Sequence, residues 1–352
     1  MSRINLESGA APGPGLPRFV APLRLPALLG LAALLLCSAP VRAQIQGCSA
    51  TSPTIAFGNV DPVGGSNYST SSSITVTCSL AFLVTGSANF SICLDIGGAA
   101  PGRVMSSGAN TLNYNLYQDS AHTTIWGSHY SEPPYPLVVN MTVSSLILGG
   151  VTQVTVPIYG YLQSSQNTTA PSGSYLQGFG GSETAVSYNF SYSLFFLPGT
   201  PTPCTSGTNN SGGTFAFNST ASVVNDCLVS ATTINFGGSV GVLTGPVTAN
   251  GTITATCTES DNYTIALSQG TTSGASLTDR QMAGSGGAVV HYELYTGSSY
   301  ATVWGDGTSG TGTASGTGNG SGQNYTVYGR VQAQTTPKPG TYSDTITVTV
   351  TY

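Results

Sequence analysis

Two stretches of the chain show the same alternation of apolar and polar positions between two cysteines. Residues 48–78 and 227–257 each contain an Ile-x-Phe-Gly run, a Gly-rich turn and an alternating run that ends at the second cysteine. Because side chains alternate between the two faces of a strand, these runs predict β-strands joined by turns. Further matching segments follow, and they pair 89–92 with 262–265, 103–105 with 280–282, 112–117 with 290–295, 125–127 with 303–305, 159–160 with 328–329, and 171–175 with 338–342. The chain is therefore one domain built twice.

Alternating runs between clusters of Gly, Ser, Asn and Pro predict seven strands in the first copy and six in the second. The first set is expected near residues 53–58, 73–78, 89–96, 111–117, 151–163, 184–196 and 213–220. The second set is expected near residues 232–236, 251–257, 262–268, 289–295, 324–333 and 343–352. We therefore expect an all-β protein with two tandem immunoglobulin-like β-sandwich domains, the second an incomplete fold that lacks its last strand. A complete sandwich of six strands is the alternative.

The beginning of the chain predicts a signal peptide over residues 1–43. An apolar core too short for a comfortable membrane span is followed by Val41-Arg42-Ala43, with small residues three positions and one position before the expected cleavage site. A lipoprotein would need a small residue before Cys37, and Leu36 occupies that position, so a lipoprotein is disfavoured. We expect cleavage before Gln44, followed by an N-terminal domain over 44–222 and a C-terminal domain over 223–352.

Charge is sparse and acidic, since only 6% of the residues are charged. Four of the eight Lys and Arg and one of the thirteen Asp and Glu precede residue 44, so the remainder carries four basic and twelve acidic side chains and a net charge of −8. So few basic side chains cannot neutralise many phosphates, which argues against a nucleic-acid partner.

An even number of cysteines in an exported chain predicts disulfides. The repeat pairs Cys48 with Cys78 and Cys227 with Cys257, and by elimination Cys93 pairs with Cys204. No CxxC motif occurs and the histidines are scattered, so we expect no metal site.

The sequence supports neither catalysis nor a cofactor. The three histidines, which lack a Ser or Cys partner at a recognisable spacing, are His122, His129 and His291. The Gly-rich run 305–322 lacks the Lys-Ser/Thr of phosphate loops and the regular Asp of calcium-binding repeats. Arg103 and Arg280 recur in both copies, which favours a structural role.

Three loops of the first copy are apolar where the second copy is polar or Gly-rich, and a clustered apolar patch indicates a contact surface. The predicted surface-binding residues are Leu80, Phe82, Leu83, Val84, Tyr135, Leu137, Val138, Phe195, Phe196 and Leu197. The alternative is that some of them extend strands into the core.

The repeated pattern resembles the spore coat U domain of secreted pilins from archaic, Csu-type chaperone–usher pili. The second copy carries the pattern closely, at Cys227, Phe236, Gly237, Cys257, Tyr263, Arg280, Met282, Tyr292, Tyr295, Trp304, Gly329, Pro339, Gly340, Tyr342 and Tyr352. The first copy departs from it by an extra cysteine pair, a longer segment after Trp126 and a closing strand of its own. A self-sufficient domain followed by an incomplete one resembles the two-domain tip adhesin of such pili.

This resemblance implies a non-enzymatic tip adhesin that attaches to hydrophobic surfaces and promotes biofilm formation. The implied partners are a periplasmic pilus chaperone, an usher, an adjacent pilin subunit that donates a strand to the C-terminal domain, and an abiotic or host surface. The implied location is the pilus tip at the cell surface, reached through the periplasm. With four residues before Cys48 after cleavage, we expect the chain to accept a strand and not to donate one. A structural shaft or coat subunit and a carbohydrate-binding lectin are the alternatives.

Overall fold

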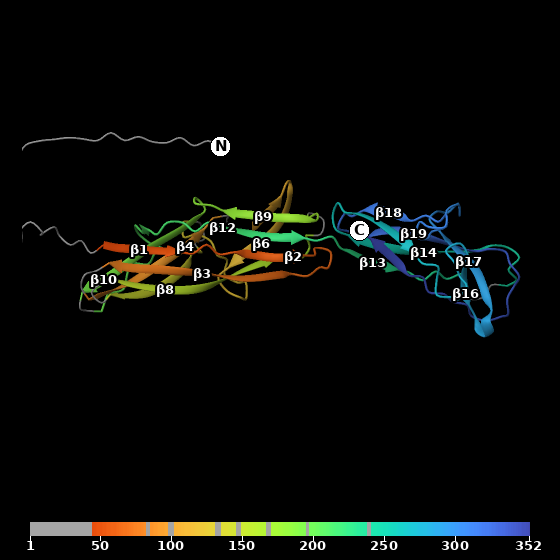
Figure 1. Cartoon of the computed structure of the whole chain (residues 1–352), viewed down its shortest axis with the longest axis horizontal. Coiled ribbons are helices and arrows are strands. Elements are labelled where there is room, and N and C mark those ends of the chain that lie inside the picture. The colour runs from red at the N-terminus through yellow and green to blue at the C-terminus, as the bar shows by residue number, and fades with distance from the viewer. Residues whose placement is uncertain are drawn as a thin grey trace, which may run out of the picture. The chain divides into compact units, whose positions relative to one another are not determined.

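The structure is a computed structural model of the chain (Figure 1). It describes residues 44–81, 85–97, 102–130, 135–145, 149–166, 170–194, 197–237 and 241–352. These residues form β-strands and turns, with one 3-10 turn at Ser285–Gly287. In this part of the chain no helix has the length and apolar character that a membrane span requires. The fold is all-β, as predicted.

Strands β1 to β12 form the first domain and β13 to β20 the second, and among the described residues no strand pairs across the two sets. The first set is β1 (Gln44–Ala50), β2 (Ile55–Val60), β3 (Tyr68–Ala81), β4 (Gly86–Ile96), β5 (Arg103–Ser107), β6 (Asn110–Tyr117), β7 (Leu137–Ser145), β8 (Gly150–Leu162), β9 (Gly173–Phe179), β10 (Thr184–Leu194), β11 (Asn210–Ser211) and β12 (Phe217–Val223). The second set is β13 (Cys227–Ala231), β14 (Val247–Cys257), β15 (Asn262–Leu267), β16 (Arg280–Ala283), β17 (Val289–Tyr295), β18 (Ala314–Thr317), β19 (Gln323–Val331) and β20 (Val348–Thr351).

The first domain packs an eight-stranded sheet, in the order β1-β3-β8-β6-β5-β9-β12-β2, against a four-stranded sheet in the order β11-β10-β4-β7. β12 closes this sandwich, because it pairs antiparallel with β9 and parallel with β2. Large side chains such as Trp126, Phe179 and Phe215 are almost completely buried between the sheets. The result is a complete sandwich with its own core.

The second domain repeats this plan with fewer strands (Figure 1). Its sheets have the orders β13-β14-β19-β17-β16 and β18-β15-β20. Trp304, Tyr263 and Ile265 occupy its core, as Trp126, Phe90 and Ile92 occupy that of the first domain. Among the described residues of this domain, no strand holds the position of β12.

The predicted strand at 232–236 does not form, and of the predicted strand at 343–352 only β20 does. The equivalent segments of the first domain are β2 and β9, and both pair with β12. Residues 233–237 and 341–347 keep an alternating pattern of exposure but lack this common ladder partner among the described residues. An extended segment without a partner strand cannot form a ladder, and this explains the difference.

Three disulfides are present, Cys48–Cys78, Cys93–Cys204 and Cys227–Cys257. The first and third join directly opposite residues of neighbouring strands, β1 with β3 and β13 with β14. The second ties β4 to the segment between β10 and β12. β12 ends at Val223 and β13 begins at Cys227, while the exact domain boundary near residue 222 stays a prediction.

Each domain buries one arginine at equivalent positions. The Arg103 guanidinium donates to the Trp126 carbonyl at 2.6 Å, and that of Arg280 donates to the Trp304 carbonyl at 2.7 Å. Arg280 also forms an ion pair of 3.0 Å with Glu293. Burial lowers the pKa of both arginines, to about 10 for Arg103. The guanidinium groups satisfy buried carbonyls, so the geometry gives these arginines a structural part.

Candidate functional site

The second domain contains an open groove of about 1050 Å³ along one side of its sandwich. One wall is formed by residues 231–237 and the other by residues 336–346. The apolar side chains at its base come from the core strands, and they include Leu267, Met282, Val290, Leu294, Val327 and Val331. The groove therefore gives access to the hydrophobic core itself.

The same place in the first domain is filled by β12. Phe217, Ser219, Ala221 and Val223 point inward from this strand and are buried, and Phe215 precedes them in the same alternation. The ring of Phe217 stacks on that of Phe179 with centroids 4.5 Å apart. The groove of the second domain is thus the space that a closing strand occupies in the first.

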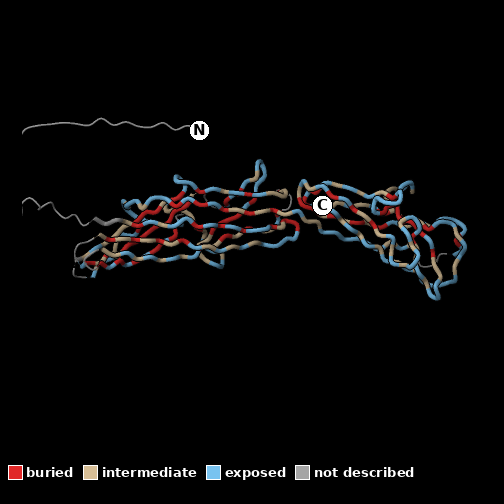
Figure 2. Tube along the Cα trace, in the orientation of Figure 1, coloured by how far each residue is buried: buried red, intermediate tan, exposed pale blue. Residues whose placement is uncertain are grey.

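Equivalent side chains in the two domains differ in burial because of this strand. Ile55 and Tyr175 are buried in the first domain, whereas their counterparts Ile234 and Tyr342 are half-buried. Residues 233–237 and 341–347 alternate between intermediate and exposed without a buried position, and Figure 2 shows the chain coloured by these classes. Partly exposed apolar side chains that face a core are a favourable site for a further strand.

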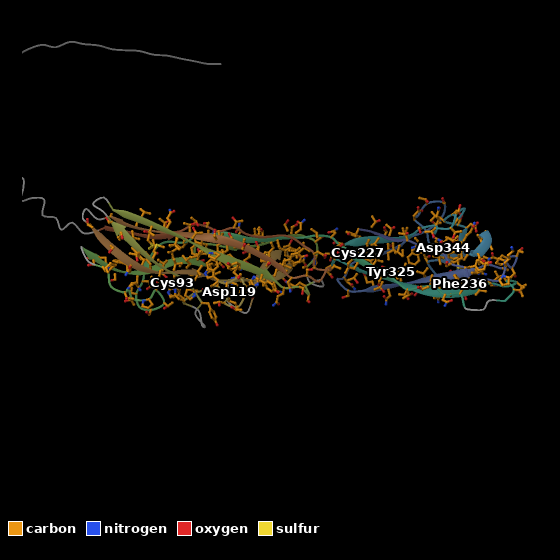
Figure 3. The ribbon with its side chains drawn as sticks, turned by 90° about the horizontal axis from the view of Figure 1, so that it is seen from below. Cys93, Asp119, Cys227, Phe236, Tyr325 and Asp344 are labelled. Carbon is orange, nitrogen blue, oxygen red and sulfur yellow. A yellow bond between two sulfur atoms is a disulfide. The ribbon has the colours of Figure 1, made fainter. Side chains whose placement is uncertain are left out.

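One wall of the groove carries a polar pair between apolar neighbours. The Tyr292 hydroxyl donates to Asp344 Oδ2 at 2.8 Å, and the amide of Thr271 donates to Asp344 Oδ1 at 2.9 Å. Burial raises the pKa of Tyr292, and the hydrogen bond to Asp344 raises it further. Asp344 and Phe236, both labelled in Figure 3, come from the two opposite walls.

The predicted surface-binding residues were expected at one end of the first domain. The register places Leu80 opposite Gly150 and Gly86 opposite both Ser145 and Leu194, so these strand ends meet at one end. The opposite end contains Tyr68, which is hydrogen-bonded to Asp61, and the end of β12, where the Val224 amide donates to the Val60 carbonyl. The first end is therefore the one remote from residue 223.

Several of the predicted residues lie outside the described part of the chain, namely Phe82, Leu83, Val84, Phe195 and Phe196. In the sequence, residues 82–84 follow β3 and residues 195–196 follow β10. Leu197, directly after them, is 94% exposed. Leu80 lies on β3 with 2% exposure, so it belongs to the core and not to a contact surface.

The prediction that Tyr135, Leu137 and Val138 join the same end is wrong. Leu137 is opposite Leu94, eight residues along β7 from the pair of Ser145 and Gly86, and its side chain is buried. Tyr135 and Val138 are partly exposed near this other end of β7. The alternation over 137–145 is the sequence signal for β7, although no strand was predicted there.

The sequence between β7 and β8, whose flanking strand ends are at the remote end, is also apolar. Residues 146–148 have the sequence Leu-Ile-Leu and, like 82–84 and 195–196, lie outside the described residues. Their flanking strand ends, Ser145 and Gly150, are opposite Gly86 and Leu80. Three segments of apolar sequence therefore follow strands that end at the same end of the first domain, namely β3, β7 and β10.

One group of polar side chains in the first domain has the composition of a hydrolase triad. His129 Nδ1 lies 2.8 Å from Asp95 Oδ1, and the Ser187 hydroxyl donates to Asp95 Oδ2 at 3.3 Å. The carboxylate is thus the central member, between the histidine and the serine. A nucleophilic serine requires the histidine beside its own oxygen, so this order does not activate Ser187.

Comparison with known proteins places the repeats in one family of domains. The family model described as Spore Coat Protein U domain matches residues 34–178 and 213–349. No curated protein sequence matches the chain.

Two solved structures are similar over most of the chain. The tip adhesion subunit CsuE of archaic Csu pili from Acinetobacter baumannii, in its pre-assembly complex with the chaperone CsuC, is 17% identical with a TM-score of 0.49, covering 87% of this chain and 100% of that chain. The CupB6 tip adhesin from Pseudomonas aeruginosa is 12% identical with a TM-score of 0.29, covering 86% of this chain and 94% of that chain.

Proposed function

Because the chain belongs to the Spore Coat Protein U domain family, we propose that it is the tip adhesin of an archaic chaperone–usher pilus, promoting surface attachment and biofilm formation. In this role it is exported through the periplasm and carries out no catalysis.

The observation that carries the proposal is the contrast between the two domains. The first domain contains its closing strand, β12, whereas the second has an open groove at the same place. Each described strand already pairs within its own sheet. A chain with one complete and one open sandwich can receive a strand at one end and present a finished domain to the outside.

The open groove supports a proposed set of assembly partners. A strand of an adjacent pilin subunit enters it and completes the second domain, which is strand addition to an exposed sheet edge. Before assembly, a periplasmic chaperone covers the same apolar surface, and the usher is the site of exchange. Ile234, Phe236 and Tyr342 then become buried, as Ile55, Phe57 and Tyr175 are in the first domain.

The remote end of the first domain supplies the contact with a surface. The apolar segments that follow β3, β7 and β10 in the sequence are Phe82-Leu83-Val84, Leu146-Ile147-Leu148 and Phe195-Phe196-Leu197. Burial of one Phe or Leu side chain against an apolar surface contributes about 1.5–3 kcal/mol, and many pili on one cell multiply the effect through avidity. Few charges take part, so attachment favours hydrophobic surfaces and depends weakly on salt.

Co-expression of residues 1–352 with and without the pilus chaperone tests the proposal. We expect a soluble one-to-one complex with the chaperone and aggregated or degraded protein without it. In cells that assemble the pilus, antibody against the first domain should label pilus ends. Labelling along the whole shaft, or soluble monomer without chaperone, would contradict the tip-adhesin role.

A further inference from the structure

We infer that the strand entering the groove runs antiparallel to residues 341–347 and carries a small hydrogen-bond donor, such as Ser or Thr, at its central inward position. The inference rests on the proposed function, because it requires a strand of a partner subunit in the groove. It names the chemistry by which this groove selects its strand. Two observations carry it, the register of β12 in the first domain and the carboxylate of Asp344 in the second.

β12 supplies the direction and register of the missing strand. It runs antiparallel to β9 and parallel to β2, and Ser219 in its middle is opposite Gln177 on β9 and Ile55 on β2. The bridge between Ser106 and Leu176 has its counterpart in the bridge between Ala283 and Ser343. The residue after Ser343 is Asp344, as Gln177 follows Leu176. Asp344 therefore faces the residue of the incoming strand that corresponds to Ser219.

The inward side chains of β12 show what such a strand presents to a core. They are Phe215, Phe217, Ser219, Ala221 and Val223, and all are buried. Only the middle one is polar. The Ser219 hydroxyl lies beside Tyr114 and offsets part of the rise in the Tyr114 pKa, although its geometry falls short of a full hydrogen bond. The Tyr114 hydroxyl itself donates to the neutral side chain of Gln177 at 2.8 Å.

In the second domain the charged Asp344 replaces the neutral Gln177, and a charged group in this position needs more hydrogen-bond donors when it is buried. Oδ1 of Asp344 accepts from the amides of Thr271 and Thr345, both at 2.9 Å, and from the hydroxyls of Thr271 and Thr272 at 3.2 and 3.5 Å. Within the described residues, Oδ2 accepts only from the Tyr292 hydroxyl. Gly270, with φ of 96°, leaves the space that this carboxylate occupies, because a Cβ there would collide with it. The carboxylate is thus held in the groove wall with acceptor capacity left on Oδ2.

A strand that closes the groove removes Asp344 from water. A buried carboxylate is costly unless donors satisfy it, and a hydrogen bond to a charged acceptor is stronger than one between neutral groups. A serine or threonine hydroxyl at the central position meets this requirement. An aliphatic side chain there leaves Oδ2 under-satisfied, and a carboxylate adds repulsion between like charges. Large apolar side chains suit the position of Phe217, where the wall residue opposite is Ile346.

The test appends a copy of residues 213–224 to residues 44–352 through a flexible Gly/Ser linker after Tyr352. Three versions of the copy keep the central residue or carry Ser219→Val or Ser219→Asp within the copy alone. A matched control carries Asn218→Asp in the copy, because Asn218 points outward and is exposed. Trp304 fluorescence reports the second domain, measured with Trp126→Phe, and the melting temperature is the readout.

We expect the copy with serine to give monomeric protein with the highest melting temperature. Ser219→Val should lower it by about 5 °C and Ser219→Asp by about 10 °C or more, while Asn218→Asp changes it little. In protein that carries Asp344→Asn, the additional loss caused by Ser219→Asp over Ser219→Val should disappear. Equal melting temperatures for the serine, valine and aspartate copies would overturn the inference and leave the strand-acceptor role intact. Failure of the serine copy to raise the melting temperature or yield monomer would instead contradict the acceptor role itself, and the inference with it.

Discussion

Ile55 and Ile234 hold equivalent positions in the two domains, yet Ile55 is completely buried and Ile234 is half-buried. Both follow the first cysteine of their repeat by seven residues and face the core of a sandwich. The difference is the presence of β12, which pairs with the segment around Ile55 and has no counterpart beside Ile234 among the described residues. One missing strand thus changes the environment of a side chain whose local sequence is almost unchanged.

This pair gives a direct mutational comparison. Ile55→Ala should reduce the free energy of unfolding of the first domain by about 2–5 kcal/mol, because it leaves a cavity in a closed core. Ile234→Ala should cost clearly less while the groove is open. Denaturant titration of protein freshly released from its chaperone complex separates the domains when Trp304→Phe accompanies Ile55→Ala and Trp126→Phe accompanies Ile234→Ala, since each domain contains one of the two tryptophans. Equal losses would mean that the groove is closed in solution.

Closure of the groove should hide apolar surface from a fluorescent hydrophobic probe. Residues 44–352 freshly released from the chaperone complex should bind the dye ANS, and appending a donor strand copied from a shaft pilin should remove most of this binding. The physical reason is that the strand covers Ile234, Phe236 and Tyr342, which are half-buried without it. The appended protein should also elute as a monomer and unfold cooperatively. Undiminished dye binding by a monomeric, appended protein would place the exposed apolar surface elsewhere.

Mutations can distinguish the apolar segments that follow β3, β7 and β10 from Leu137 and Val138, which the sequence wrongly predicted at the same end. Replacing Phe82 and Leu83, Leu146 and Ile147, or Phe196 and Leu197 by Ser should abolish attachment to a hydrophobic surface while pili still assemble.

Val138→Ser is the matched control. Val138 is 44% exposed but lies on β7 away from the remote end, so its replacement should leave attachment unchanged. Attachment is measured by counting bound cells on polystyrene, with pili quantified by immunoblot. Loss of attachment in the control, or normal attachment by the combined six-residue variant, would move the contact surface to another part of the domain.

The buried phenol of Tyr114 should make the first domain sensitive to alkali. Burial raises the pKa of Tyr114 to about 12, above the value near 10 of an unfolded tyrosine. The neutral phenol therefore contributes stability that is fully present below pH 10 and is lost as the pH rises to about 12, amounting to about 2–3 kcal/mol. Denaturant midpoints between pH 9 and 12 should fall less steeply in Tyr114→Phe than in the unchanged protein. Parallel curves would show that Tyr114 ionises with an ordinary pKa.

The disulfide between Cys93 and Cys204 should contribute more to the first domain than Cys48–Cys78. It closes a sequence separation of 111 residues, against 30 for the other bridge, and a longer loop loses more conformational entropy in the unfolded chain. Replacing both Cys93 and Cys204 by Ala should lower the free energy of unfolding by about 2–5 kcal/mol. The measurement is denaturant unfolding followed by Trp126 fluorescence, with Cys48→Ala/Cys78→Ala as the comparison. If removing Cys93–Cys204 lowers the free energy of unfolding less than removing Cys48–Cys78 does, loop length does not determine the contribution of these disulfides.

The amino-acid sequence by itself determined the all-β class, the duplication and the cysteine pairs. Period-two alternation is a local property of a strand, and the repeat transfers each landmark, such as Phe57 to Phe236, from one domain to the other. The cysteine pairs followed because Cys48–Cys78 and Cys227–Cys257 recur with equal spacing.

Only the tertiary structure decided which apolar segments share an end and which segments are strands. Whether residues 232–236 form a strand depends on a ladder partner that is remote in sequence, and local alternation carries no information about that partner. The place of Leu137 likewise depends on the register of β7 against β4, where eight residues separate one end of the sandwich from the other. In the sequence, Asp344 has no charged residue within five positions on either side. It became a candidate for strand selection because folding brings its carboxylate to Tyr292 and to the wall of the groove.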